Sequence, residues 1–358
     1  MSHSPAAESI RQQLEAIEAQ TLSPHAQLAR CSAGRLRPEP EDDLRTCYQR
    51  DRDRVVHSKA FRRLAGKTQV FLAPAGDHYR TRITHTLEVA QVARTICRCL
   101  RLNESLCEAI VMAHDLGHTP FGHAGEKVLA HLMPGGFHHV KQSLRVIDQL
   151  EQDGRGLNLT HEVRDGVLKH SKGKGAVLSD NPNLRATTLE GQIVRLADLI
   201  AYVNHDLDDA VRARLLRLEE VPQPLLDTLG STLSQRLRRL VVDVVAATGR
   251  SIEAGQPAVR MSSEMQEALT EMRDFLFQRV YESEPVRAEF ERAQDLLSAL
   301  WHHWHRHEAE FRAKHWPRGV AEEEGLDRAI GDFLSGMTDR YAIRMYKERI
   351  MPREWPIL

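Results

Sequence analysis

The sequence predicts an all-α fold, and three observations support this prediction. Strand signals are few, and aromatic residues make up only 5% of the 358 residues. Leucine, alanine, glutamate and arginine dominate the composition. Apolar residues recur at helical spacing along most of the chain, which is typical of amphipathic helices. A chain of this length can bury a substantial core as one large domain or two ordinary ones.

Three segments of the chain differ in character. Residues 1–40 combine one amphipathic piece with a polar stretch, so we expect an N-terminal arm that docks loosely or on a neighbouring subunit. Residues 41–210 hold most of the motifs and form the expected core. Residues 211–358 show plain amphipathic periodicity, which predicts additional C-terminal helices packed on that core.

Charge and cysteine content restrict the class of protein. The formal net charge of −1 excludes a strongly basic nucleic-acid footprint over the whole chain, although a local basic pocket is compatible with it. The five cysteines lack zinc-ribbon spacing, which favours reduced thiols in a cytosolic protein. No apolar stretch reaches the roughly 18 residues of a membrane span, and residues 1–10 do not resemble a secretory signal. We therefore expect a cytoplasmic protein that does not enter the membrane.

Two predicted helices have polar residues at their ends. The first covers about residues 86–100 and directly follows His85. The second begins at Asn103, which is a good N-cap, and Gly117 is its natural stop. The dipeptide HD at 114–115 then falls in the last turn, and the electronegative end of a helix favours a bound cation.

A third predicted helix carries an unusual polar stripe. It starts at TTLE (187–190), a capping-box pattern, and continues to about residue 210. Asp198, Tyr202 and Asp206 are each four residues apart, so they lie on one face. A solvated face explains most such stripes. Here a tyrosine surrounded by acids makes a functional face an equal alternative.

The stretch HDLGHTPFGHAGE (114–126) contains three histidines and two acids within thirteen residues. A packed core does not need so many titratable groups, because buried polar groups cost free energy unless they are paired. A solvated helix face does not need the three glycines and the proline, which weaken helices. The stretch therefore predicts a functional site.

His85, His114, Asp115 and Asp198 are candidate ligands of one divalent metal ion. Imidazole suits Mn, Fe, Zn or Ni, and carboxylate suits Mg or Mn as well, so the identity of the metal stays open. Four protein ligands leave positions on a six-coordinate ion for water and substrate. On spacing alone this set is only moderately specific, because His-Asp pairs are common.

The order of these residues resembles the H…HD…D signature of the HD-domain metal phosphohydrolases. Five longer segments resemble the bacterial deoxyguanosine triphosphate triphosphohydrolases and their deoxynucleotide-hydrolysing relatives. The resemblance is strong from about 35 to 210 and weaker at 274–286 and 336–346. The five segments are RDRDRVVHSKAFRRLAGKTQVF (50–71), DHYRTRITHTLEVAQVAR (77–94), AHDLGHTPFGHAGE (113–126), GLNLTHEVRDGVLKHS (156–171) and GQIVRLADLIAYVNHDLDD (191–209).

The resemblance implies an HD-domain helical core and hydrolysis of a deoxynucleoside triphosphate to the deoxynucleoside and tripolyphosphate. It makes the four candidate ligands named above the metal ligands. It makes His123 and Glu126 the catalytic pair, on one face of a helix that Thr119-Pro120 can start. It also makes His118 an active-site residue whose role stays open.

The resemblance also implies substrate contacts. Gln69 and Val70 match positions that meet the deoxyribose, and Arg82 matches an arginine near the α-phosphate. Tyr202 and Asp206 match residues that face the sugar and its 3′-hydroxyl, where a packed tyrosine would exclude a 2′-hydroxyl. His139 matches a family histidine, but Val140 stands where the family often has asparagine. Several basic residues could neutralise a triphosphate: Arg62, Arg63, Lys67, Lys169 and Lys172.

Two alternative functions remain open at this point. One is another HD phosphohydrolase, such as a nucleoside monophosphate phosphatase. The other is a non-catalytic nucleotide sensor or single-stranded nucleic-acid binder, with nucleic acid as a secondary partner at most because the net charge is near zero. Relatives form ring-like or paired-dimer oligomers and some need an activating nucleotide. The resemblance therefore favours a homo-oligomer and allows such an activator.

Overall fold

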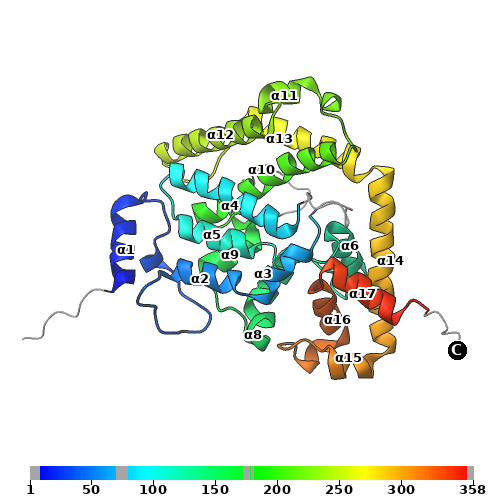
Figure 1. The fold of residues 1–358 in the computed structure, drawn as a ribbon. Coiled ribbons are helices and arrows are strands. Elements are labelled where there is room, and N and C mark those ends of the chain that lie inside the picture. The colour runs from blue at the N-terminus through cyan, green and yellow to red at the C-terminus, as the bar shows by residue number, and fades with distance from the viewer. Residues whose placement is uncertain (1–8, 70–79, 172–177, 179–180, 353–358) are drawn as a thin grey trace, which may run out of the picture.

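The computed structural model describes residues 9–69, 80–171, 178 and 181–352. This part of the chain contains no β-strand, only two isolated bridges, so the predicted all-α fold is confirmed. None of its helices is both long and apolar enough to cross a bilayer. The α-helices, shown in Figure 1, are α1 (Ile10–Thr21), α2 (Cys47–Val56), α3 (Lys59–Arg63), α4 (Arg82–Cys99), α5 (Glu104–Ala113), α6 (Gly122–Leu132), α7 (His139–Arg145), α8 (Glu151–Gly154), α9 (His161–Lys169), α10 (Leu189–Arg212), α11 (Gln223–Leu229), α12 (Leu233–Glu253), α13 (Ser263–Leu276), α14 (Glu284–Arg306), α15 (Glu308–Lys314), α16 (Gly325–Ser335) and α17 (Asp339–Arg349).

The buried apolar residues form two clusters. The main core joins α2, α4, α5, α9 and α10, and α11 to α13 pack against it. The second cluster joins α6 to α14, α15, α16 and α17, with Trp301 and Trp304 as buried anchors. Helix α6 therefore packs mainly on C-terminal helices, although it lies early in the chain.

The starts of the helices follow local capping, with two differences from the sequence prediction. Asn103 caps α5 as expected, because its side chain accepts hydrogen bonds from two backbone N–H groups of the first turn. Helix α4 starts at Arg82, so His85 lies inside its first turn and does not precede it. Thr188 caps α10, but Glu190 does not complete a capping box. The Glu190 carboxylate instead accepts hydrogen bonds from the backbone of Gln27 and Asn103.

Two predicted boundaries near the HD dipeptide were wrong. Helix α5 ends at Ala113, so Gly117 is not its stop. A Cβ at Gly117 would lie 2.1 Å from the backbone nitrogen of Ser143, so this position needs glycine for a close approach to α7. Helix α6 starts at Gly122 and not at Thr119-Pro120. Phe121, its N-cap, has a left-handed backbone with φ of 60°.

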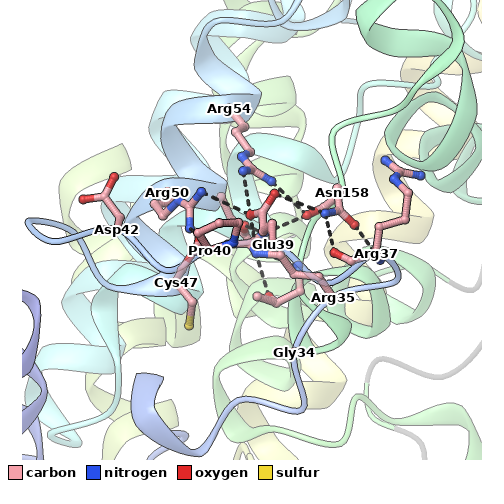
Figure 2. A network of polar contacts seen from close by, with 12 residues as sticks. Gly34, Arg35, Arg37, Glu39, Pro40, Asp42, Cys47, Arg50, Arg54 and Asn158 are labelled. Carbon is pink, nitrogen blue, oxygen red and sulfur yellow. Dashed lines mark hydrogen bonds and ion pairs between the residues drawn. The ribbon is translucent and has the colours of Figure 1, made fainter.

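The N-terminal arm docks on the core of the same chain through buried polar contacts. Arg35 pairs with Asp51 and also donates to the carbonyl oxygen of Asn158 at 2.7 Å. Glu39 accepts hydrogen bonds or ion pairs from three arginines, as Figure 2 shows around Arg35, Arg54 and Asn158. At Arg35 and Glu39 the arm is therefore held on its own chain, while docking on a neighbouring subunit stays a prediction.

The Arg35–Asp51 pair gives a first testable prediction. The Asp51 side chain is fully buried and that of Arg35 is 7% exposed, so Asp51→Asn leaves a buried guanidinium with only Glu39 as a charged partner. We expect the free energy of unfolding to fall by about 3 kcal/mol, the scale for breaking a buried ion pair. Urea unfolding measures it. Asp53→Asn is the matched control, because one of its arginine partners is exposed and the other is partly exposed, so the loss should stay below about 1 kcal/mol. Equal losses in both variants would contradict the assignment.

Candidate metal centre and active site

Four candidate ligands, from helices α4 and α10 and from the turn that follows α5, meet in the core. The Nε2 atom of His85 in α4 lies 3.0 Å from Oδ1 of Asp198 in α10. The Nε2 atom of His114, at the end of α5, lies 3.9 Å from the same oxygen and 3.7 Å from Oδ1 of Asp115. His85, His114 and Asp115 are buried, and their ligand atoms lie within 4.8 Å of one another. The structure thus brings the predicted residues together.

The hydrogen bonds of His114 fit a metal ligand. Its Nδ1 atom lies 2.6 Å from the carbonyl oxygen of Val111, and a carbonyl only accepts, so Nδ1 carries the proton. Its Nε2 atom is then an acceptor, and it is buried without a hydrogen-bond partner among the described residues. A buried acceptor without a partner costs free energy, and a bound cation would satisfy it. Metal-binding histidines commonly show this second hydrogen bond.

His170 joins the same group, and sequence reasoning missed it. Its Nδ1 atom lies 2.8 Å from the carbonyl oxygen of Val167, which leaves Nε2 for the site. Its ring meets that of His114 edge to face at 4.9 Å. Its ligand atom groups with those of His114 and Asp198, and also with those of Asp115 and His139. Burial lowers the pKa of His170 to about 3, so the imidazole is neutral. The available signal was its position at the end of a helix, which matches that of His114.

Arg82 lies beside this group and not in open solvent. It is buried, and it donates a 2.6 Å hydrogen bond to Oδ2 of Asp115. Burial opposes ionisation of Asp115, but His114 and Arg82 hold the pKa of its carboxyl well below the usual range. The carboxylate is therefore charged and can bind a cation with its other oxygen.

A second group of titratable residues surrounds Glu126 in α6. Its Oε1 atom accepts a 2.8 Å hydrogen bond from the backbone of His139 and lies 2.9 Å from Nδ1 of the same residue. The Nδ1 atom of His123 is farther, at 3.7 Å from Oε2, and the His123 side chain is 58% exposed. Burial would raise the pKa of Glu126, but His123 and His139 hold it well below its ordinary range. His118 stacks on His139 at 4.6 Å.

The predicted substrate residues differ in what surrounds them. The Oε1 atom of Gln69 is buried and has no hydrogen-bond partner in the described part of the chain. Val70 lies outside the described residues. Tyr202 is half-buried and stacks on Tyr281 with ring centroids 6.2 Å apart. The Tyr281 hydroxyl donates to Asp206, whose pKa burial raises to about 7. Tyr281 was not predicted, because it lies 75 positions from Asp206 in the chain.

The basic residues proposed for a triphosphate are mostly engaged elsewhere. Lys67 is buried and donates to the backbone carbonyls of His118 and Ser335, so it does not face open space. Lys169 pairs with Asp165 at 2.7 Å. Arg62 lines a separate cationic cavity of about 400 Å³. Lys172 lies outside the described residues.

Comparison with known proteins agrees with this arrangement. The HD domain family matches residues 82–202, and the phosphohydrolase-associated domain family matches residues 259–348. A deoxyguanosinetriphosphate triphosphohydrolase-like protein of Caldanaerobacter subterraneus subsp. tengcongensis is 49% identical, over 97% of this chain and 97% of that protein. Proteins with the same name from Desulfatibacillum aliphaticivorans and Clostridium perfringens are 45% and 44% identical, each over 96% of this chain and 98% of the relative. With such identity over nearly its whole length, the chain belongs to the family of deoxyguanosinetriphosphate triphosphohydrolase-like proteins and carries an HD domain of the metal-dependent hydrolase type.

Proposed function

We propose that the protein hydrolyses deoxynucleoside triphosphates to the deoxynucleoside and tripolyphosphate. The observation that carries this proposal is the buried Nε2 atom of His114, which has no hydrogen-bond partner in the described part of the chain and lies near His85, Asp115 and Asp198 in a chain of this family. In the proposed reaction a water oxygen bonds to the α-phosphorus and the bond from that phosphorus to the 5′-oxygen breaks. The water loses a proton and the 5′-oxygen gains one.

One divalent metal ion would bind to His85, His114, Asp115 and Asp198, with His170 as a further ligand from this chain. When bound, such an ion polarises the phosphate and lowers the pKa of a coordinated water. Arg82 would help to balance phosphate charge, since its guanidinium already lies beside Asp115. Which of Mn, Mg, Fe, Zn or Ni is native stays open.

The proton transfers are assigned to the group around Glu126. An imidazole can move a proton near neutral pH, and we propose His123 as the group that does so, with Glu126 as its carboxylate partner. The 3.7 Å separation of His123 and Glu126 is loose, as catalytic contacts often are without substrate. His139 takes the closer position on Glu126, so we propose that it orients the carboxylate and contacts phosphate. His118 would support His139 by stacking.

Sugar selection is assigned to the stacked rings of Tyr202 and Tyr281, together with Gln69 and Val70, which the resemblance makes deoxyribose contacts. A ring packed against the sugar would exclude a 2′-hydroxyl. Asp206 would meet the 3′-hydroxyl and share its carboxylate with the Tyr281 hydroxyl. A cytoplasmic location, a homo-oligomeric state and an activating nucleotide remain predictions.

Product analysis tests the reaction. The wild-type protein, incubated with single and mixed deoxynucleoside triphosphates and with Mn²⁺ or Mg²⁺, should release tripolyphosphate and deoxynucleoside in equal amounts, as resolved by ion-exchange chromatography. Orthophosphate from monophosphates would point instead to an HD phosphatase. Tight nucleotide binding without turnover under any metal or nucleotide mixture would favour the sensor, and selective binding of single strands would favour the nucleic-acid binder.

Loss of the metal is the expected result for His114→Ala combined with Asp115→Ala. The double variant removes two of the four assigned ligands, so metal per chain by elemental analysis should fall to background while circular dichroism still shows a helical protein. His161→Ala is the control, because it removes an exposed histidine from the start of α9. A double variant that keeps its full metal content would rule out the assigned centre.

The acid–base assignment predicts a different pattern. His123→Ala and Glu126→Gln should keep metal content and nucleotide affinity, while turnover falls by about 10²–10⁴-fold, the usual contribution of such groups. His131→Ala, an exposed histidine on the same helix, should behave like wild type. Wild-type turnover in both test variants would move the proton chemistry to His118 or His139.

A further inference from the structure

Asp339 contacts two separate segments that lead into the active site. This residue opens α17 and is 5% exposed. Its Oδ1 atom accepts a 2.9 Å hydrogen bond from the backbone nitrogen of Phe121. Its Oδ2 atom accepts a 2.9 Å hydrogen bond from the backbone nitrogen of Thr68 and another from the Thr68 hydroxyl. One carboxylate thus joins residues that are 218 and 271 positions away in the chain.

Both contacts lie next to residues of the proposed mechanism. Thr68 directly precedes Gln69, and Phe121 is the N-cap of α6, two residues before His123. Phe121 has a left-handed backbone and no side-chain cap of its own. The Asp339 carboxylate therefore accepts from the N-cap backbone N–H, as the N3 glutamate of a capping box usually does, while Ala124 stands at N3 in α6. Its negative charge also lies at the positive end of the α6 dipole.

Lys67 ties the same two segments a second time. Its Nζ atom donates at 2.9 Å to the carbonyl oxygen of Ser335, the last residue of α16, and also to the carbonyl oxygen of His118. A Cβ at Gly66 would lie 3.0 Å from Cγ2 of Thr338, so the backbone approaches this turn closely. Residues 66–68, 118–121 and 335–339 form one buried junction, which we name the C-terminal clasp.

Packing explains how the C-terminal clasp can affect the position of α6. Helix α6 belongs to the second apolar cluster, through Phe121, Ala124, Val128 and Leu129, and so do α14, α16 and α17. The metal group lies among the helices of the main core. The position of His123 and Glu126 relative to the metal group therefore depends on where the C-terminal helices hold α6.

We propose that Asp339 is a positioning residue, which sets the distance between the acid–base helix and the metal group through the C-terminal clasp. It touches neither substrate nor metal in this assignment. The effect on turnover rests on the proposed function. The effect on amide hydrogen exchange does not depend on that function.

Asp339→Asn is the main variant, because it preserves the volume of the side chain. It leaves one acceptor oxygen where Thr68 and Phe121 each need one. The turnover number should fall by about tenfold to a hundredfold, the scale of a misplacement of about 1 Å, while KM changes less than threefold and metal content stays at the wild-type value. Asp327→Asn is the control. It removes an exposed carboxylate from α16 whose partner is the partly exposed His305, and it should leave all three quantities unchanged.

Thr68 variants separate positioning from general stability. Thr68→Val removes the hydroxyl bond to Asp339 and keeps the shape, so turnover should fall by a smaller factor. Thr68→Ser keeps the hydroxyl, so the turnover of this variant should equal that of the wild type. Combined with Asp339→Asn, Thr68→Val should add little, because both act through one contact.

Amide hydrogen exchange tests the C-terminal clasp without reference to activity. Peptides that contain Thr68 or Phe121 should exchange at least tenfold faster in Asp339→Asn, while peptides from α4 and α10 keep their rates. Wild-type turnover in Asp339→Asn, or unchanged exchange at both peptides, would overturn the proposal. If wild-type protein hydrolyses no nucleotide, the proposed function fails, and the exchange result still decides whether Asp339 holds the two segments.

Discussion

The convergence of buried polar atoms from α4, α5 and α10 is the constraint on which the rest of the structure depends. Asp115 and His114 are buried in a group of polar side chains within the helical core, where an unpaired charge or acceptor costs several kcal/mol. The neighbouring helices tolerate this because apolar residues such as Val89, Ile110 and Ala197 fill the remaining space. Arg82 neutralises one side of the carboxylate group. The apolar packing around it thus supports a group of buried atoms that a bound cation would satisfy.

The site consists of two halves that different parts of the chain hold in place. The main core fixes the candidate metal group, while α6 brings His123 and Glu126 and packs on α14, α16 and α17. Tyr281, which precedes α14, adds a third connection by donating to Asp206 in α10. The region that matches the phosphohydrolase-associated domain therefore contacts Asp206 through Tyr281 and packs against α6, so it borders both halves of the candidate site.

Local patterns predicted what depends on neighbouring residues in the chain. Helical periodicity gave the fold class, and Asn103 was identified as a cap because capping needs only the next three residues. Contacts between distant segments were not predictable in this way. Gly117 looked like a helix stop, but its requirement comes from Ser143. Lys67 looked like a phosphate ligand, but two carbonyls from distant segments hold it. His170 was missed because nothing beside it in the sequence is a ligand.

Glu126 shows which contacts residue spacing predicts and which it does not. A spacing of three in a helix places His123 and Glu126 on one face, and the structure has them there, 3.7 Å apart. The closer partner is His139, which offers both its backbone nitrogen and its ring. The Nδ1 atom of His139 lies 2.9 Å from Oε1 and 3.1 Å from Oε2, so it spans both carboxylate oxygens. A carboxylate oxygen has more than one acceptor direction, so Oε2 can also accept from His123. The hydrogen bonds from His123 and His139 oppose the effect of burial and hold the pKa of Glu126 well below its ordinary range. Glu126 thus stays ionised between a buried imidazole, which fixes its orientation, and an exposed one, which solvent can reach.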